Sequence, residues 1–226
     1  MSPGQQLGLA TIDGRLMDGL KFCLKVYKLF DQVRGAPDGI AKLRLRPTRT
    51  ADMNEKKLLE ELLPIARYIQ ARYSEGRRIK VRWFSGSQPY DAIIWSSGGK
   101  VTHGEASRRA LVEVTTSVHP NEHLARRLLH ERGGSFGPKG ISRDKETGAI
   151  ISKPHVHTPD ELAADLADQI LECLKSKSSK QYPPGTTLII NCITTASSFL
   201  MNGMTQSSEY ERPRRTWHFE KCSCWR

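Results

Sequence analysis

The stretches Tyr90-Asp91-Ala92-Ile93-Ile94-Trp95 and Ala110-Leu111-Val112-Glu113-Val114-Thr115-Thr116 each place one acidic residue inside an apolar run. Both are rich in β-branched or aromatic residues and lie between Gly, Ser and Pro, which predicts two β-strands. A carboxylate inside a buried strand is costly unless it is paired, hydrogen-bonded or bound to a metal. We therefore predict that Asp91 and Glu113, on successive strands, share one divalent cation such as Mg²⁺, which prefers oxygen ligands.

The composition describes a basic chain that has enough apolar residues to form a core. The 226 residues, of which 38% are hydrophobic, are typical of one domain with extensions. Lys and Arg number 35 against 24 Asp and Glu, which gives a net charge of +11. Such a charge favours a polyanionic partner, most often nucleic acid, although a generically basic protein is the alternative.

The cysteines and the hydropathy of the chain predict where in the cell the protein is found. The five cysteines are odd in number and show no disulfide framework, which predicts reduced thiols and a cytoplasmic location. No apolar run approaches the roughly 20 residues of a membrane span, and the N-terminus lacks the pattern of a secretory signal. We therefore expect no membrane association.

Periodicity predicts the order helix, strand, strand, strand, helix, helix, strand for the core. The pattern Thr158-Pro159-Asp160-Glu161 is a capping box that begins the last helix. Pro64 is expected either to kink the first core helix or to mark its later start. Residues 133–157, rich in Gly, Lys and Arg, are predicted to form a mobile loop. The helices are expected at 14–33, 54–73, 120–132 and 158–174, and the strands at 79–84, 90–95, 110–116 and 187–193, with a short edge strand or linker at 42–46.

These elements predict an α/β fold in which helices flank a central mixed β-sheet. Residues 1–50 are expected to form an N-terminal helical extension, 51–195 the α/β core, and 196–226 a tail that packs on the core or on a partner. Each predicted helix has an apolar stripe, which is Leu124, Leu128 and Leu129 in the helix at 120–132. The other three helices have longer stripes. These stripes are Leu16, Leu20, Cys23, Leu24, Tyr27 and Phe30; Leu58, Leu62, Ile65 and Ile69; and Leu162, Leu166, Ile170 and Leu174.

The order of elements, with Asp91 in the second strand and Glu113 in the third, resembles the PD-(D/E)XK nuclease superfamily over roughly residues 52–195. The resemblance implies a restriction-endonuclease-like fold and a metal-dependent nuclease that cleaves phosphodiester bonds. It also implies that Asp91 and Glu113 ligate Mg²⁺ or Mn²⁺. The first-helix acid of some members corresponds to Glu61, which borders the apolar stripe, or less closely to Glu55 or Glu60; we expect Glu60 to face solvent.

Each of these acids also has an ordinary structural interpretation. Asp91 could be satisfied by a strand-end amide or by a surface arginine, and Glu61 could be a solvated helix residue. Glu113 could be the buried partner of an arginine such as Arg82 or Arg126.

The motif departs from the family pattern at two places. Pro89-Tyr90-Asp91 has one residue inserted between Pro and Asp, and Thr115 stands where the family has Lys. A neutral hydroxyl cannot offset charge on a phosphate, so Thr115 would instead contact the attacking water or a neighbouring group. We assign the missing positive charge to Arg126. The alternatives are Arg127, Lys100 and His123.

Basic residues around this core are candidates for contacts with the phosphate backbone of nucleic acid, with DNA favoured. If Thr115 reflects lost activity, the alternative is a catalytically inactive nuclease-like fold. That protein would bind nucleic acid or protein within a larger complex, for example of a phage or a defence system. A protein partner or a homodimer is also left open. The candidate backbone contacts are Lys100, Arg108, Arg109, Arg127, Lys139 and Arg143.

Overall fold

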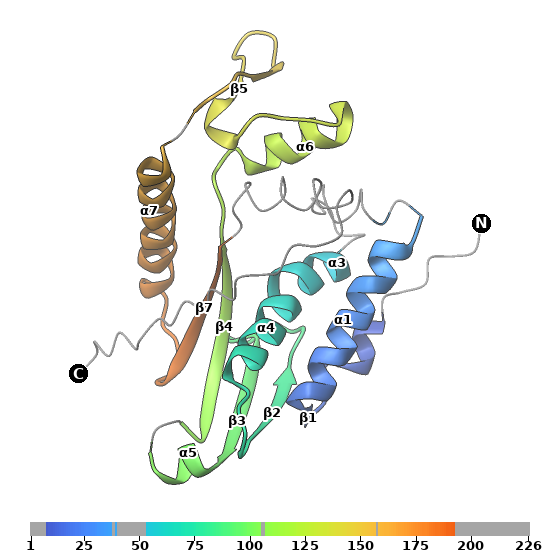
Figure 1. Cartoon of the computed structure of the whole chain (residues 1–226), viewed down its shortest axis with the longest axis vertical. Helices are drawn as coiled ribbons and strands as arrows, with labels where there is room; N and C mark the ends of the chain where they lie inside the picture. The colour runs from blue at the N-terminus through green and yellow to red at the C-terminus, as the bar shows by residue number, and fades with distance from the viewer. Residues whose placement is uncertain (1–7, 38, 40–52, 105–106, 157, 193–226) are drawn as a thin grey trace, which may run out of the picture. The chain divides into compact units, whose positions relative to one another are not determined.

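One mixed sheet organises the part of the chain that the computed structural model describes, which is residues 8–37, 39, 53–104, 107–156 and 158–192 (Figure 1). The strand order is β1-β2-β3-β4-β7. The pairs from β1 to β4 are antiparallel, whereas β7 joins β4 in parallel. The predicted α/β class with a mixed sheet flanked by helices is thus confirmed. The strands are β1 Met17–Asp18, β2 Arg77–Trp83, β3 Ala92–Gly98, β4 Arg109–Ser117 and β7 Thr186–Cys192.

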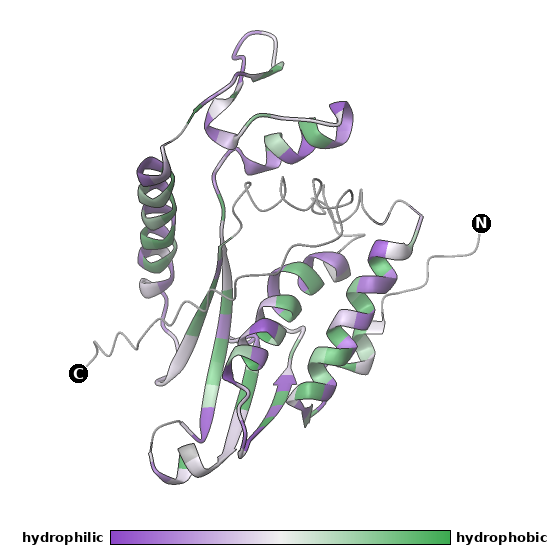
Figure 2. Cartoon of the chain, in the orientation of Figure 1, coloured by the Kyte–Doolittle hydropathy of each residue, from purple (hydrophilic) through white to green (hydrophobic). Residues whose placement is uncertain are grey.

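Two helices, α1 (Gly19–Gly35) and α4 (Leu63–Arg72), lie side by side on one face of this sheet (Figure 1). Figure 2 shows apolar residues on both helices and on the strands beneath them. Their buried side chains share one core with the inward residues of β2, β3 and β4. The first helix therefore packs within the same core as the rest of the described chain. That core includes Phe22, Val26, Ile65, Ile69, Val81, Trp83, Ile94 and Val112.

The buried face of α1 differs from the predicted stripe. Leu16, Leu20 and Leu24 are 46%, 48% and 57% exposed. The helix begins at Gly19, whose missing Cβ would lie 3.2 Å from the carbonyl oxygen of Ile79 on β2. Because the glycine allows this close approach to the sheet, the face that continues from it is the one that is buried. The buried residues of α1 are Gly19, Phe22, Cys23, Val26, Leu29 and Val33.

A single helix α7 (Pro159–Ser178) packs against β4 and β7. It begins with the predicted capping box, in which Thr158 and Glu161 exchange side-chain to backbone hydrogen bonds, so this prediction is confirmed. Leu162 and Leu174, predicted to be buried, are 44% and 41% exposed. The face toward the sheet is half-buried and consists of Leu166, Gln169, Ile170, Cys173 and Lys177.

The segment 133–157, predicted to form a mobile loop, has regular elements that the prediction missed. It contains a 3-10 turn η4 (Pro138–Gly140) and a hairpin of β5 (Ile141–Arg143) and β6 (Ile150–Ser152). Ile141 and Ile150 pack with α6 (Glu122–Arg132) in a second small core. Strands of three residues are too short to give a periodic signal, which explains why the pattern missed them.

The remaining described elements are short. They are η1 (Gly8–Thr11), α5 (Gly99–Thr102), α3 (Met53–Lys57) and the π-helical segment η3 (Leu58–Leu62), which continues directly into α4. The predicted strand at 42–46 and the tail at 196–226 lie outside the described residues. Within the described residues, no helix is long and apolar enough to cross a membrane.

Candidate active site

The candidate site lies where β3 and β4 part. The pairing of these strands ends at Ala92 opposite Val112, whereas β4 continues to Ser117 alongside β7. Asp91 stands at the point of divergence. Its backbone N–H donates to the Val112 carbonyl (2.8 Å), and its Oδ2 accepts the Val114 N–H (2.7 Å). The carboxylate therefore takes the place of the strand partner that β4 lacks here. A strand-end amide is one of the two structural partners that the sequence suggests for Asp91.

A pocket of about 310 Å³ opens beside this carboxylate. Three separate parts of the chain contribute to it: the segment η3 before α4, the strand β4 together with Asp91 just before β3, and α7. The two oxygens of Asp91 differ, because Oδ1 has no hydrogen-bond partner among the described residues. The pocket is lined by Glu60, Glu61, Asp91, Val114, Thr115, Thr116 and Lys177.

Glu61 reaches the pocket from the helix and is half-buried, not solvated. The Trp83 indole N–H donates to its Oε2 at 3.0 Å. Burial raises the pKa of Glu61 to about 7, and repulsion from Asp91 acts in the same direction. Burial likewise raises the pKa of Asp91 to about 6; the hydrogen bond from Val114 opposes this shift, and repulsion from Glu113 adds to it. The ionisation of Asp91 is thus linked to both neighbouring acids.

The π-helical segment η3 explains why two successive glutamates line one pocket. Pro64 lies two residues after the end of this segment. A proline inside a helix lacks an N–H and crowds the carbonyl four residues earlier, here that of Glu60. A π-turn widens the helix at this point, and such turns are frequent at functional sites. Glu60, expected to face solvent, is half-buried and lines the pocket with Glu61. The predicted stripe of Leu58, Leu62, Ile65 and Ile69 is buried, as expected.

Glu113 is paired with a lysine of α7 and not with an arginine. Lys177 Nζ donates to Glu113 Oε1 at 2.7 Å, and the Tyr182 hydroxyl donates to the same oxygen at 3.2 Å. The side chains of Lys177 and Glu113 are largely buried, at 17% and 14% exposed. Burial lowers the pKa of Lys177, but the hydrogen bond and the charge of Glu113 outweigh it, so that the pKa is raised overall. Lys177 is therefore a fully charged cation inside the pocket.

The arginine predicted to supply the missing positive charge does not lie at the pocket. Arg126 lies on α6 and pairs with Glu122 at 3.0 Å, and it does not line the pocket. Among the alternatives, Arg127 pairs with Glu131, and the His123 ring contacts the Pro120 carbonyl. The side chain of Lys100 lies outside the described part. Thr115 lines the pocket beside Lys177, as its predicted role requires.

Sequence reasoning missed Lys177, although a signal was present. Lys177 follows Ile170 by seven residues and Cys173 by four, so all three share one helical face. Cys173 Sγ lies 3.8 Å from the Thr116 carbonyl of β4, which shows that this face meets the sheet. The lysines at the end of the helix, taken from sequence alone, suggest only a favourable interaction with the helix dipole.

The residues predicted to contact the nucleic-acid backbone are dispersed over several elements. Arg108 and Arg109 are exposed at the start of β4, and Arg143 is exposed on β5. Lys139 pairs with Asp165 of α7 at 2.6 Å, and Arg127 lies in its ion pair on α6. Among those with described side chains, Arg108 and Arg109 thus lie at the start of β4, whereas Arg127, Lys139 and Arg143 lie on α6, η4 and β5.

The carboxylates suit a cation of the Mg²⁺ class by their chemistry. Within the described residues, no three His, Cys, Asp or Glu side chains form a ready ligand set. Mg²⁺, however, usually keeps several waters and takes one or two carboxylates together with substrate phosphates. The carboxylates of this site match that requirement. Oδ1 of Asp91 has no hydrogen-bond partner among the described residues. The negative charge of Glu113 raises the pKa of Asp91, and that of Asp91 raises the pKa of Glu61.

Comparisons with known proteins add no assignment. No protein-family model, no curated protein and no solved structure matches this chain.

Replacing Glu61 by Gln tests its buried environment through the pH dependence of stability. The folded-state pKa of about 7 exceeds the ordinary 4.5, so ionised Glu61 destabilises the fold. The stability that protonation provides is complete below pH 4.5 and is lost as the pH rises to about 7. Glu61→Gln should therefore raise the free energy of unfolding by about 2–3 kcal/mol above pH 7 and by nothing near pH 4.

Urea unfolding in EDTA at several pH values measures this difference. Glu131→Gln is the matched control, since Glu131 is exposed on α6. An equal effect of Glu61→Gln at every pH would contradict the proposed environment.

Proposed function

We propose that this chain is a metal-dependent nuclease of the PD-(D/E)XK type. The observation that carries the proposal is the meeting of Asp91, Glu113 and Lys177 at the point where β3 and β4 part. Two acids on adjacent strands with one lysine beside them are the chemical groups that the family motif supplies. Here the lysine comes from α7, although Thr115 occupies its position in the motif.

The order of the strands is also compatible with the restriction-endonuclease-like type. The antiparallel strands β2, β3 and β4 are followed by the parallel strand β7, and helices pack on both faces of the sheet. Glu61 enters from the helix that precedes β2, which is the position of the first-helix acid in the resemblance. These features support the proposal without depending on the short motif alone.

Asp91 and Glu113 would hold the divalent cation, with Glu61 as a further oxygen donor. When bound, such a cation lowers the pKa of water and stabilises negative charge on a phosphoryl oxygen. The pocket fits this use because burial and mutual repulsion raise the pKa values of Glu61 and Asp91. A bound cation would offset that repulsion. Binding should consequently release protons near neutral pH.

The protein's own side chains would do three things during hydrolysis. Lys177 places a fixed positive charge beside the scissile phosphate and offsets the charge that develops there. The carboxylate of Glu61, when it is not bound to the cation, could take the proton that the attacking water loses. The Thr115 hydroxyl can orient the attacking water by a hydrogen bond. The water oxygen forms a bond to phosphorus, one P–O ester bond breaks, and the departing oxygen takes up a proton from solvent.

The direct test is cleavage of DNA and RNA substrates by the purified protein with Mg²⁺ or Mn²⁺ and, in parallel, with EDTA. We expect cleavage with the metal and none with EDTA. Binding of nucleic acid without cleavage under every metal condition would overturn the nuclease and favour the inactive nuclease-like fold. Products that carry a 5′ or a 3′ phosphate would show which ester bond breaks.

A further inference from the structure

The two faces of the sheet differ in how they are covered. α1 and α4 pack on one face, and α7 packs on β4 and β7 at the other. On β2, the residues that alternate with the buried Ile79, Val81 and Trp83 point to the face opposite to α1 and α4. These residues are Arg78, Lys80 and Arg82. Arg78 and Lys80 are exposed, and Arg82 is half-buried.

The neighbouring strands continue this array across the sheet. Trp95 of β3 lies opposite Lys80 on one side and opposite Arg109 of β4 on the other. The Arg82 guanidinium lies 6.0 Å from the centre of the Trp95 ring. We call Arg78, Lys80, Arg82, Trp95 and Arg109 the basic face. It places a half-buried aromatic ring among four cations.

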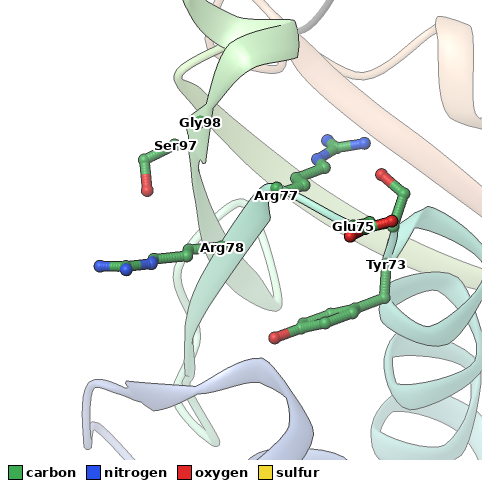
Figure 3. Close-up of a pocket in the computed structure, with 8 residues that line it drawn as sticks. Tyr73, Glu75, Arg77, Arg78, Ser97 and Gly98 are labelled. Atoms are coloured by element: carbon green, nitrogen blue, oxygen red, sulfur yellow. The ribbon is translucent and has the colours of Figure 1, made fainter.

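The far end of the basic face lies at a hollow of about 860 Å³ where β2 begins (Figure 3). Figure 3 shows Arg78 and Ser97 pointing to one side of the strands, whereas Arg77, Tyr73 and Glu75 lie on the other side. Arg77 has a structural role, since it donates to the Arg72 carbonyl and to Ser96 Oγ.

The charges of the basic face are not neutralised within the described residues. No salt bridge there involves Arg78, Lys80, Arg82 or Arg109. Asp18 lies opposite Lys80 in the β1–β2 register, but its carboxylate accepts the N–H groups of Leu20 and Lys21 at the start of α1. Among the described residues, no acidic side chain therefore competes with an anionic partner for these cations.

We propose that the basic face binds the sugar-phosphate backbone of single-stranded nucleic acid, with Trp95 as a stacking surface for one base. Alternate residues on a strand are about 6.8 Å apart, twice the rise per residue, and this spacing suits successive phosphates of an extended chain. An aromatic ring among cations is typical of single-strand binding, because unpaired bases expose a face on which to stack. Bases of a duplex are already stacked on one another and offer no such face.

The basic face leads directly to the candidate active site. Arg82 precedes Trp83, which pairs with Ala92, the residue that follows Asp91. On β4, Arg109, Leu111 and Glu113 alternate on the same face as Trp95. A strand that follows the basic face would thus be delivered to Asp91 and Glu113. This part of the inference rests on the proposed nuclease, whereas the binding itself does not.

The test is the affinity of a fluorescent oligothymidylate and of a duplex of the same length, measured by anisotropy in EDTA over a range of salt. We expect tighter binding of the single strand by the wild type. Arg78→Gln with Lys80→Gln should reduce the slope of log affinity against log salt by about 1.4, since each phosphate contact in a single strand contributes about 0.7. Trp95→Leu should weaken binding about tenfold with little change of that slope.

Matched controls separate this effect from net charge and from folding. Lys21→Gln with Lys28→Gln removes the same charge from the exposed surface of α1 and should leave the affinity unchanged. Circular dichroism and thermal melting check each variant, and Arg109→Gln on β4 provides a second independent disruption. Equal losses in the α1 control, or equal or tighter binding of the duplex, would overturn the proposal.

Failure of the nuclease and failure of this inference give different results. In one result, single-strand binding depends on Arg78, Lys80 and Trp95, but the protein cleaves no substrate. That result would support the basic face and exclude the nuclease. The opposite result is that the variants of these residues cleave and bind single strands as the wild type does. That result would support the nuclease and exclude the basic face.

Discussion

Asp91→Asn and Glu113→Gln should each reduce the rate of metal-dependent cleavage at least about 10³-fold, or about 4 kcal/mol of transition-state stabilisation. Both changes remove a charged oxygen ligand and keep the size of the side chain. The amide oxygen introduced by Asp91→Asn would still be able to accept the Val114 N–H, so the strand junction is preserved. The measurement is single-turnover cleavage with saturating Mg²⁺.

Loss of folding should not explain this effect for Asp91. Its pKa is raised to about 6 by burial, so the ionised carboxylate is unfavourable in the folded protein at neutral pH. Asp91→Asn should thus be at least as stable as the wild type in EDTA. Asp31→Asn, on the exposed surface of α1, is the control that should retain full activity. Full cleavage by Asp91→Asn would remove the site from consideration.

Lys177→Met should slow cleavage by about 10²- to 10³-fold, the size of effect seen when one preorganised donor to a developing anion is lost. The reason is that no other cation lines the pocket within the described residues. Lys175→Met is the matched control, because Lys175 is exposed two residues earlier on the same helix. Lys177→Arg keeps the charge and should recover part of the rate.

A merely structural role for Lys177 would give a different pattern. The pair with Glu113 is largely buried, and its loss should also lower the free energy of unfolding by about 1–3 kcal/mol. Glu113 would then be free of its cationic partner, so binding of Mg²⁺ should be retained or tightened while cleavage is lost. Cleavage that returns to the wild-type rate at a temperature where Lys177→Met is fully folded would assign Lys177 to stability alone.

The acids of the site could be found from sequence because each interrupts an otherwise apolar pattern. Asp91 and Glu113 stand inside strand-like runs, and the structure brings both to one site, where Lys177 lines the pocket with Asp91 and pairs with Glu113. Glu61 could be named only as one of three acids, because the choice depends on the π-turn before Pro64. A local widening of a helix has no counterpart in a simple 3.6-residue period.

The faces of α1 and α7 were harder to predict for a related reason. Both helices carry apolar residues around more than half of their circumference, so more than one stripe fits the period. In α1 the close approach of Gly19 to β2 decides between the stripes. In α7 the half-buried face contacts an acid, Glu113, that lies 64 residues away in the sequence, and a local pattern cannot reveal such a contact.

The central claim is that the carboxylates at the parting of β3 and β4 hold a divalent cation. Its most direct test is calorimetric titration of Mn²⁺ into the nucleic-acid-free protein, with wild type, Asp91→Asn, Glu113→Gln and Lys177→Met side by side. We predict saturable binding in the wild type and in Lys177→Met, and its loss in both carboxylate variants. Binding that is the same in all four proteins, or absent from the wild type, would contradict the account.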